Sequence, residues 1–254
     1  MNFALISSYA FFLICCVCII LVCSQKSGGA GKQNPPLKAL DFSLDYDRDP
    51  DETNSYTHAS LQVKNLPPSF TICAAFMVEA WNQYTSANLF VLLDNNGEAW
   101  FWVEINAQET YTQFTIGIEN SPGFSNKTKI LFSPLQWTRV CLSKCSNTSL
   151  AKLVVDGELL IEEEVKVKKT PENASLVLGI SDFSEEANPG QRTDVNIFCK
   201  ALTVERMKSQ TSAGDGHCGL EGDFLSWDKS VEEEQWALHS KARWVNLDGG
   251  LEGP

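Results

Sequence analysis

The sequence predicts an all-β protein: an antiparallel two-sheet sandwich of the jelly-roll type, with one or two short helices near the C-terminus. From about residue 55 onward, short apolar or alternating segments follow one another, separated by turn signals. Helical periodicity is visible only beyond residue 200. The chain has 254 residues, of which 43% are hydrophobic, and this is enough to fill the core of one such domain.

The strand predictions rest on alternation and on the turns between segments. Residues 59–63 alternate between apolar and polar, as in a strand with one buried face, whereas residues 69–81 are apolar on both faces and predict a central strand. Asp156-Gly157, within residues 152–163, predicts a hairpin because this dipeptide accepts the positive φ of a type I′ turn. The other strands are expected at residues 89–94, 98–106, 113–119, 137–143, 175–180 and 194–198.

Two helix starts are visible near the end of the chain. Residues 202–210 predict a helix with Thr203 as its N-cap. Ser230 and Glu233 have the spacing of a capping box and predict a second helix after Ser230. The same tail is equally compatible with a strand around Trp244.

The N-terminal segment is apolar and uncharged from residue 3 to residue 23. We interpret residues 1–24 as a cleaved signal peptide; the alternative is a retained anchor, and membrane contact is expected only in that case. Residues 25–40 predict a flexible linker, and residues 41–254 the folded domain. N-glycosylation sequons at Asn126, Asn147 and Asn173 favour the secretory pathway. The sequence therefore predicts a secreted glycoprotein.

The charge and the cysteines narrow the class of protein. A formal net charge of −12 makes nucleic acid a poor partner, because phosphate backbones bind basic surfaces. Five of the nine cysteines follow the apolar N-terminal segment, and these five contain no Cys-x-x-Cys pair that would indicate a zinc site. Outside the cell we expect disulfides, with one thiol left over. These five are Cys73, Cys141, Cys145, Cys199 and Cys218.

Five motifs in the same order resemble the pentraxin family. They are SYTHASLQVKNLPPSFTICAAFMV, QWTRVCLS, AKLVVDGELL, LVLG followed by DVNIFCKALTVERM, and FLSW, and together they cover roughly residues 55–245. The resemblance implies a concanavalin A-like jelly roll with a Cys73–Cys141 disulfide. We expect Cys199 to pair with Cys218, since a helix and a turn separate them, which leaves Cys145 as the odd thiol.

The resemblance also implies a calcium site between an Asp-Asn turn and an acidic loop. Asp94 and Asn95 stand at the turn, and the loop offers Asp182, Glu185 and Glu186. Ser181 and Phe183, however, occupy positions where the family has carboxylates. Because calcium requires six to eight oxygen ligands, we expect any calcium binding to be weak and favour a solvated loop.

The strand predicted at residues 98–106 offers a sugar site. Strict alternation would place Trp100, Trp102 and Glu104 on one face, together with Asn106. Two tryptophans and a carboxylate could stack on and orient a sugar. The stretch EINAQE also resembles the acidic strand of laminarinase-like glycosidases. Asn106, however, replaces the middle acid of that strand, and strict alternation would place Glu109 on the opposite face from Glu104. We therefore expect no catalysis.

These observations predict a secreted, pentraxin-like recognition module that binds glycans or other surface ligands. The alternative is an adhesive or receptor-ectodomain module that binds protein without a small-ligand site, and a glycosidase is the third hypothesis. The expected partners are a glycan or a cell-surface or protein ligand. The oligomeric state and the identity of the ligand are left open.

Overall fold

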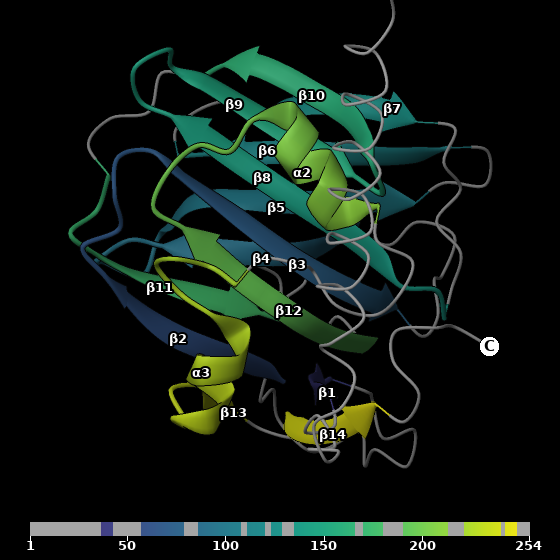
Figure 1. Cartoon of the computed structure of the whole chain (residues 1–254), viewed down its shortest axis with the longest axis vertical. Helices are drawn as coiled ribbons and strands as arrows, with labels where there is room; N and C mark the ends of the chain where they lie inside the picture. Colours follow the sequence, from purple (N-terminus) through teal and green to yellow (C-terminus); the bar gives the residue numbers. More distant parts are fainter. Residues whose placement is uncertain are drawn as a thin grey trace, which may run out of the picture. The chain divides into compact units, whose positions relative to one another are not determined.

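The computed structural model describes most of the chain from residue 37 to residue 247 (Figure 1). All described residues belong to one compact unit, Leu37–Pro254. The described ranges are 37–42, 57–78, 86–107, 111–119, 123–128, 135–165, 170–179, 190–212, 221–239 and 242–247.

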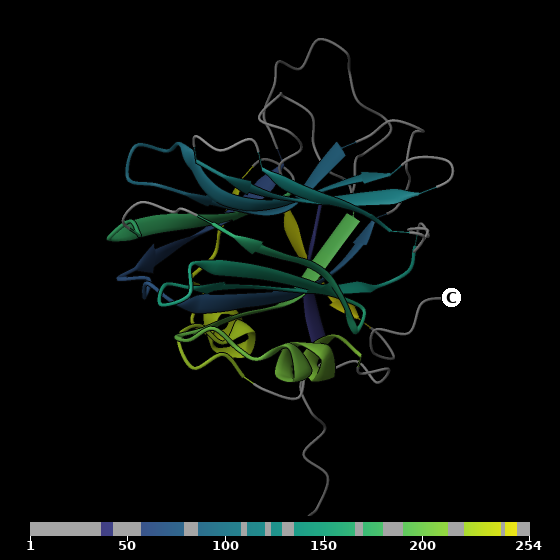
Figure 2. The same cartoon turned by 90° about the horizontal axis from the view of Figure 1, so that it is seen from above.

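The structure is a sandwich of two seven-stranded antiparallel sheets, which confirms the predicted fold class (Figure 2). The first sheet has the order β10-β9-β8-β3-β12-β1-β14, and the second has the order β13-β2-β11-β4-β5-β6-β7. The strands of the first sheet are β1 (Leu37–Asp41), β3 (Phe70–Val78), β8 (Thr138–Cys145), β9 (Leu150–Val155), β10 (Glu158–Glu164), β12 (Gly190–Phe198) and β14 (Arg243–Leu247). Those of the second are β2 (His58–Lys64), β4 (Ser86–Leu93), β5 (Ala99–Ala107), β6 (Thr112–Ile118), β7 (Phe124–Thr128), β11 (Asn173–Leu178) and β13 (Ala237–His239).

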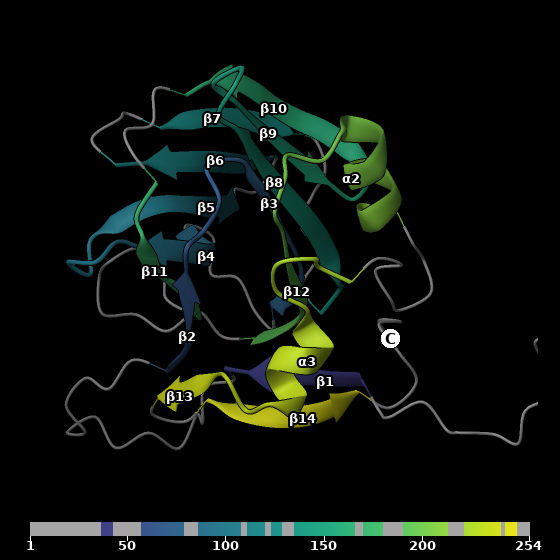
Figure 3. The same cartoon turned by 60° about the vertical axis from the view of Figure 1, so that its left-hand side comes forward.

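Strand β1 corrects the boundary predicted for the linker 25–40. It pairs with both β12 and β14, and Figure 3 shows it beside β14. Ala39 and Leu40 are fully buried, and this burial provides the driving force for a strand where composition predicted a linker. The predicted signal peptide, residues 1–24, lies outside the described residues.

Two helices occur in the described part of the chain: α2 (Val204–Thr211) and α3 (Trp227–Glu232). Helix α2 confirms the prediction, because the Thr203 side chain caps it by accepting from the Arg206 amide. The predicted capping box is wrong: α3 begins after Ser226, and Ser230 lies inside it, donating through Oγ to the Trp227 carbonyl at 2.8 Å. The strand alternative around Trp244 is correct and is β14.

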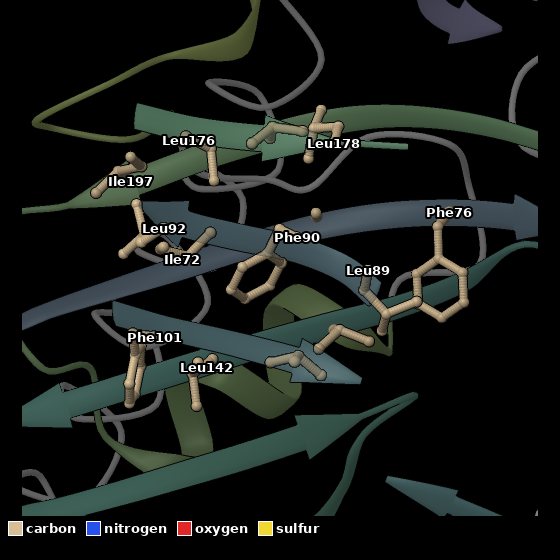
Figure 4. Close-up of a cluster of buried hydrophobic side chains, with 14 of the residues drawn as sticks. Ile72, Phe76, Leu89, Phe90, Leu92, Phe101, Leu142, Leu176, Leu178 and Ile197 are labelled. Atoms are coloured by element: carbon tan, nitrogen blue, oxygen red, sulfur yellow. The ribbon is translucent and has the colours of Figure 1, made fainter. Parts of the chain in front are cut away.

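The main core lies between the two sheets. Side chains from both sheets meet there, and ten of them are labelled in Figure 4: Ile72, Phe76, Leu89, Phe90, Leu92, Phe101, Leu142, Leu176, Leu178 and Ile197. Both described helices pack on the first sheet, α2 against β8, β9 and β10 and α3 against β12. The outer face of the second sheet is not covered by either helix, and this face carries the sequence-predicted sugar site.

Candidate recognition site

Strand β5 presents a polar and aromatic strip on the outer face of the second sheet. Phe101, Val103 and Ile105 are buried in the main core. Because side chains alternate along a strand, Trp102 and Glu104 point to the opposite face, and both are half-buried there. The predicted face of these two residues agrees with the geometry, and their part in ligand binding stays a prediction.

Trp100 does not lie on the face predicted for it, which is the face of Trp102 and Glu104. The β4–β5 register shifts between Leu92 and Leu93, and this irregularity breaks the simple alternation at the start of β5. Trp100 is consequently 2% exposed and lies in the core, with its ring centroid 6.2 Å from that of Phe70. It cannot stack on a sugar beside Trp102.

Gly117 leaves the space that the indole of Trp102 occupies. The two residues are opposite each other in the β5–β6 register. A Cβ built on Gly117 would lie 1.7 Å from Trp102 Cε2, so the indole occupies the space that any other side chain would need. The sequence analysis missed this residue because its role depends on the strand register.

Glu104 has no second carboxylate directly opposite it. Its cross-strand neighbours are Asn88 on β4 and Thr115 on β6. Retaining glycoside hydrolysis needs two carboxyl groups about 5–5.5 Å apart. Glu109, the other candidate acid, lies outside the described residues.

The Asp94–Asn95 turn is closed by its own side chains. Asp94 Oδ1 accepts hydrogen bonds from the Asn96 amide at 2.8 Å and the Glu98 amide at 2.9 Å. Asn95 Oδ1 accepts from the Asn173 amide at 3.2 Å, which ties the turn to the start of β11. Both side chains therefore have a structural role.

The described residues around this turn supply too few oxygen ligands to hold calcium by themselves. Asp94 is the single carboxylate lining the hollow there, whereas calcium requires several. No group of three or more histidine, cysteine or acidic side chains suited to a metal occurs among the residues that the structure describes. The acidic loop leaves the opposite end of β11, after Leu178, and Asp182, Glu185 and Glu186 lie outside the described residues. Calcium binding stays a prediction.

The three sequon asparagines all lie on exposed positions. Asn126 is on the edge strand β7, where its Nδ2 donates to the Leu160 carbonyl. Asn147 is in the β8–β9 turn, and Asn173 begins β11. Each can reach solvent, as a glycan requires.

The predicted Cys73–Cys141 disulfide is present. The two residues are opposite each other on β3 and β8, with a Cα–Cα separation of 4.1 Å. Cys199 is exposed and forms no disulfide with another described cysteine. Cys218 lies outside the described residues, so the second pair stays a prediction.

Cys145 is half-buried and forms no disulfide with another described cysteine, and its place as the odd thiol stays a prediction. Hydrogen bonding to Thr148 is the main cause that lowers its pKa below the usual value for a thiol. Its neighbour Lys144 is buried; Nζ donates to the Pro68 carbonyl at 2.8 Å and lies 5.7 Å from the Trp100 ring. Desolvation lowers the pKa of this lysine. Sequence reasoning missed the arrangement because its residues come from strands β5 and β8, the β8–β9 turn and the segment between β2 and β3.

Removing the Thr148 hydroxyl should slow alkylation of Cys145. The T148V change removes the main interaction that lowers the pKa of the thiol, so less thiolate is present at pH 7. We expect the iodoacetamide rate at Cys145, followed by peptide mass spectrometry, to fall roughly two- to tenfold, the equivalent of one hydrogen bond. S209A, on the distant α2, is the control and should leave the rate unchanged. An unchanged rate in T148V would contradict the assignment.

Comparisons with known proteins agree with this architecture. The family described as the concanavalin A-like lectin/glucanases superfamily matches residues 51–208. Jeltraxin of Lepidobatrachus laevis is 32% identical over 103 residues, which cover 37% of this chain. The match spans 44% of Jeltraxin, so the chain covers less than half the length of this relative.

Two solved structures share the fold. A native heptameric SAP-like pentraxin from Limulus polyphemus superimposes with a TM-score of 0.66 at 14% identity, covering 83% of this chain and 95% of that one. A putative carbohydrate-binding protein from Bacteroides ovatus gives a TM-score of 0.53 at 13% identity, covering 85% of this chain and 61% of that one. At these identities the likeness concerns the fold alone.

Proposed function

Because the chain belongs to the concanavalin A-like lectin/glucanases superfamily and carries a pentraxin-like domain, we propose that it is an extracellular, non-catalytic module that recognises glycans or other surface ligands. The observation that carries the proposal is the indole of Trp102, which lies over Gly117 and on the same outward face as Glu104.

This pair of side chains suits a sugar. Trp102 and Glu104 are two residues apart on one strand and therefore lie on the same face, about 7 Å apart along it. An indole presents a flat apolar surface to the C–H groups of a pyranose, and a carboxylate accepts hydrogen bonds from its hydroxyl groups. Asn106 continues the strip on the same face and adds an amide.

The extracellular location is supported by the disulfide and the sequons, since disulfides persist in oxidising compartments. Among the described residues, no helix has the length and apolarity needed to cross a membrane. The absence of catalysis is supported by Asn88 and Thr115, which flank Glu104 where a second acid would be needed.

The glycan site can be tested on an array of immobilised glycans. W102A should weaken binding about fivefold, because a stacked aromatic ring contributes on the order of 1 kcal/mol. G117A should weaken it as well, since the added methyl displaces the indole. W137A is the matched control: Trp137 is also half-buried but packs beside Ala75 of β3, on the other sheet, and its loss should not affect binding. Equal binding by W102A and the parent protein would refute the site.

Calcium should leave the melting temperature of the protein unchanged. A metal bound to the native state raises the melting temperature by mass action, but the described Asp94 turn supplies too few ligands. Melting curves at roughly 1 mM calcium, an extracellular level, should match those with chelator. A rise that D94N abolishes would instead establish a calcium site at the turn and make calcium part of recognition.

A further inference from the structure

A polar hollow lies at the rim of the outer face, where β2, β11 and the β4–β5 turn meet. Its volume is about 460 Å³, within the range of roughly 300–1,000 Å³ that small-molecule pockets span. The lining residues are Gln62, Leu93, Asp94, Asn95, Gly97, Asn173, Ala174 and Ser175. One of them, Asn173, is the acceptor of an N-glycosylation sequon.

The side chain of Asn173 points to the face on which the hollow lies. Ala174 and Leu176 are in the main core, so Asn173 and Ser175 alternate with them and face outward. Gln62 is opposite Ser175 on β2 and donates to its hydroxyl through Nε2 at 2.5 Å. The Asn95 side chain fixes the amide of Asn173 against the turn. A sugar joined to Asn173 Nδ2 would therefore start at the hollow.

We propose that Asn173 carries an N-linked glycan whose first N-acetylglucosamine occupies this hollow. The inference rests on the proposed extracellular location, because N-glycosylation takes place in the secretory lumen. Asn173 is exposed, and Asp94, Asn95 and Gln62 surround the hollow with groups that bond hydroxyl and acetamido groups. Gly97 leaves room for the ring, since a Cβ built on it would meet nothing within 4 Å.

The glycan would cover the Asp94–Asn95 turn. This turn is the place where the pentraxin resemblance implies one half of a calcium site. A covered turn leaves Trp102 and Glu104, farther along the outer face, as the surface for an external ligand. The other two sequons differ, because Asn147 lies in an exposed turn and Asn126 on the edge strand β7, and neither lines this hollow.

The test uses protein secreted from a eukaryotic host that makes oligomannose glycans. Glycopeptide mass spectrometry should find Asn173 occupied. N126Q/N147Q protein carries a glycan at Asn173 alone, and endoglycosidase H trims that glycan to one N-acetylglucosamine. We expect this form to melt about 2–4 °C above the N126Q/N147Q/N173Q protein, the shift that one or two hydrogen bonds produce in a domain of this size. Hydrogen exchange in the peptide containing Asp94–Glu98 should also be slower in the trimmed form.

The matched control carries only the Asn147 glycan. N126Q/N173Q protein, trimmed in the same way, should have the same melting temperature as the triple variant. Its hydrogen-exchange rate in the peptide containing Asp94–Glu98 should also equal that of the triple variant. If Asn147 carries a glycan and Asn173 carries none, the inference is overturned, but the proposed extracellular location still holds. Occupied Asn173 with equal melting and equal exchange would show that the sugar does not enter the hollow. No glycan at any sequon would overturn both the inference and the proposed location.

Discussion

Replacing Trp227 with alanine should lower the free energy of unfolding by about 3–5 kcal/mol, the usual cost of truncating a buried tryptophan. Trp227 is 1% exposed and its ring centroid lies 5.6 Å from those of Trp236 and Trp244. Its Nε1 donates to the Lys38 carbonyl at 3.1 Å, which joins α3 to β1. The truncation therefore leaves a cavity and removes a contact between two distant parts of the chain.

Denaturant unfolding followed by far-ultraviolet circular dichroism measures this loss without depending on tryptophan fluorescence. W137A is again the control, because Trp137 is half-buried, and its removal should cost clearly less. A similar loss in both variants would show that the tryptophan cluster has no special part in stability.

Removing the Cys73–Cys141 disulfide should lower the free energy of unfolding by about 4 kcal/mol. The bond closes a span of 68 residues, and the loop-entropy estimate for such a span gives this magnitude. The C73A/C141A double variant avoids leaving a lone buried thiol. Both cysteines also pack under α2, against Met207, so part of the loss reflects a smaller side chain in that cluster.

The measurement compares C73A/C141A with C145S, which removes the free thiol and should change the stability by no more than about 0.5 kcal/mol. A non-reducing peptide map of the parent protein should contain the Cys73–Cys141 linked peptide. Finding either cysteine as a free thiol, or equal stability in the two variants, would contradict the assignment.

The fold could be predicted because most of its strands and turns are recognisable from short stretches of sequence. Alternation between apolar and polar side chains, and turns such as Asp156-Gly157, identify strands without knowledge of their partners. Strand β1 escaped prediction because it is five residues long and depends on β12 and β14, which lie far along the chain. The second helix was misplaced because Ser230 fits a capping box in sequence but bonds inside α3.

The site was predicted only in part, for a related reason. Simple alternation placed Trp102 and Glu104 on the correct face, because Phe101, Val103 and Ile105 of the same strand all point into the core. Trp100 was assigned to the wrong face because a register shift between neighbouring strands leaves no mark in a single sequence. Gly117 and the hollow beside Asn173 depend on residues that meet only when separate strands pair.

The pairing of β1 with β14 makes the domain suitable for circular permutation. Leu37 is opposite Leu247 in this pair, so their Cα atoms are about 5 Å apart. A short peptide could join the two positions without crossing the sandwich. New ends could then be opened in the exposed β8–β9 turn at Asn147. This turn belongs to the first sheet, whereas Trp102 lies on the second. The same proximity would let the whole domain be inserted into a surface loop of another protein.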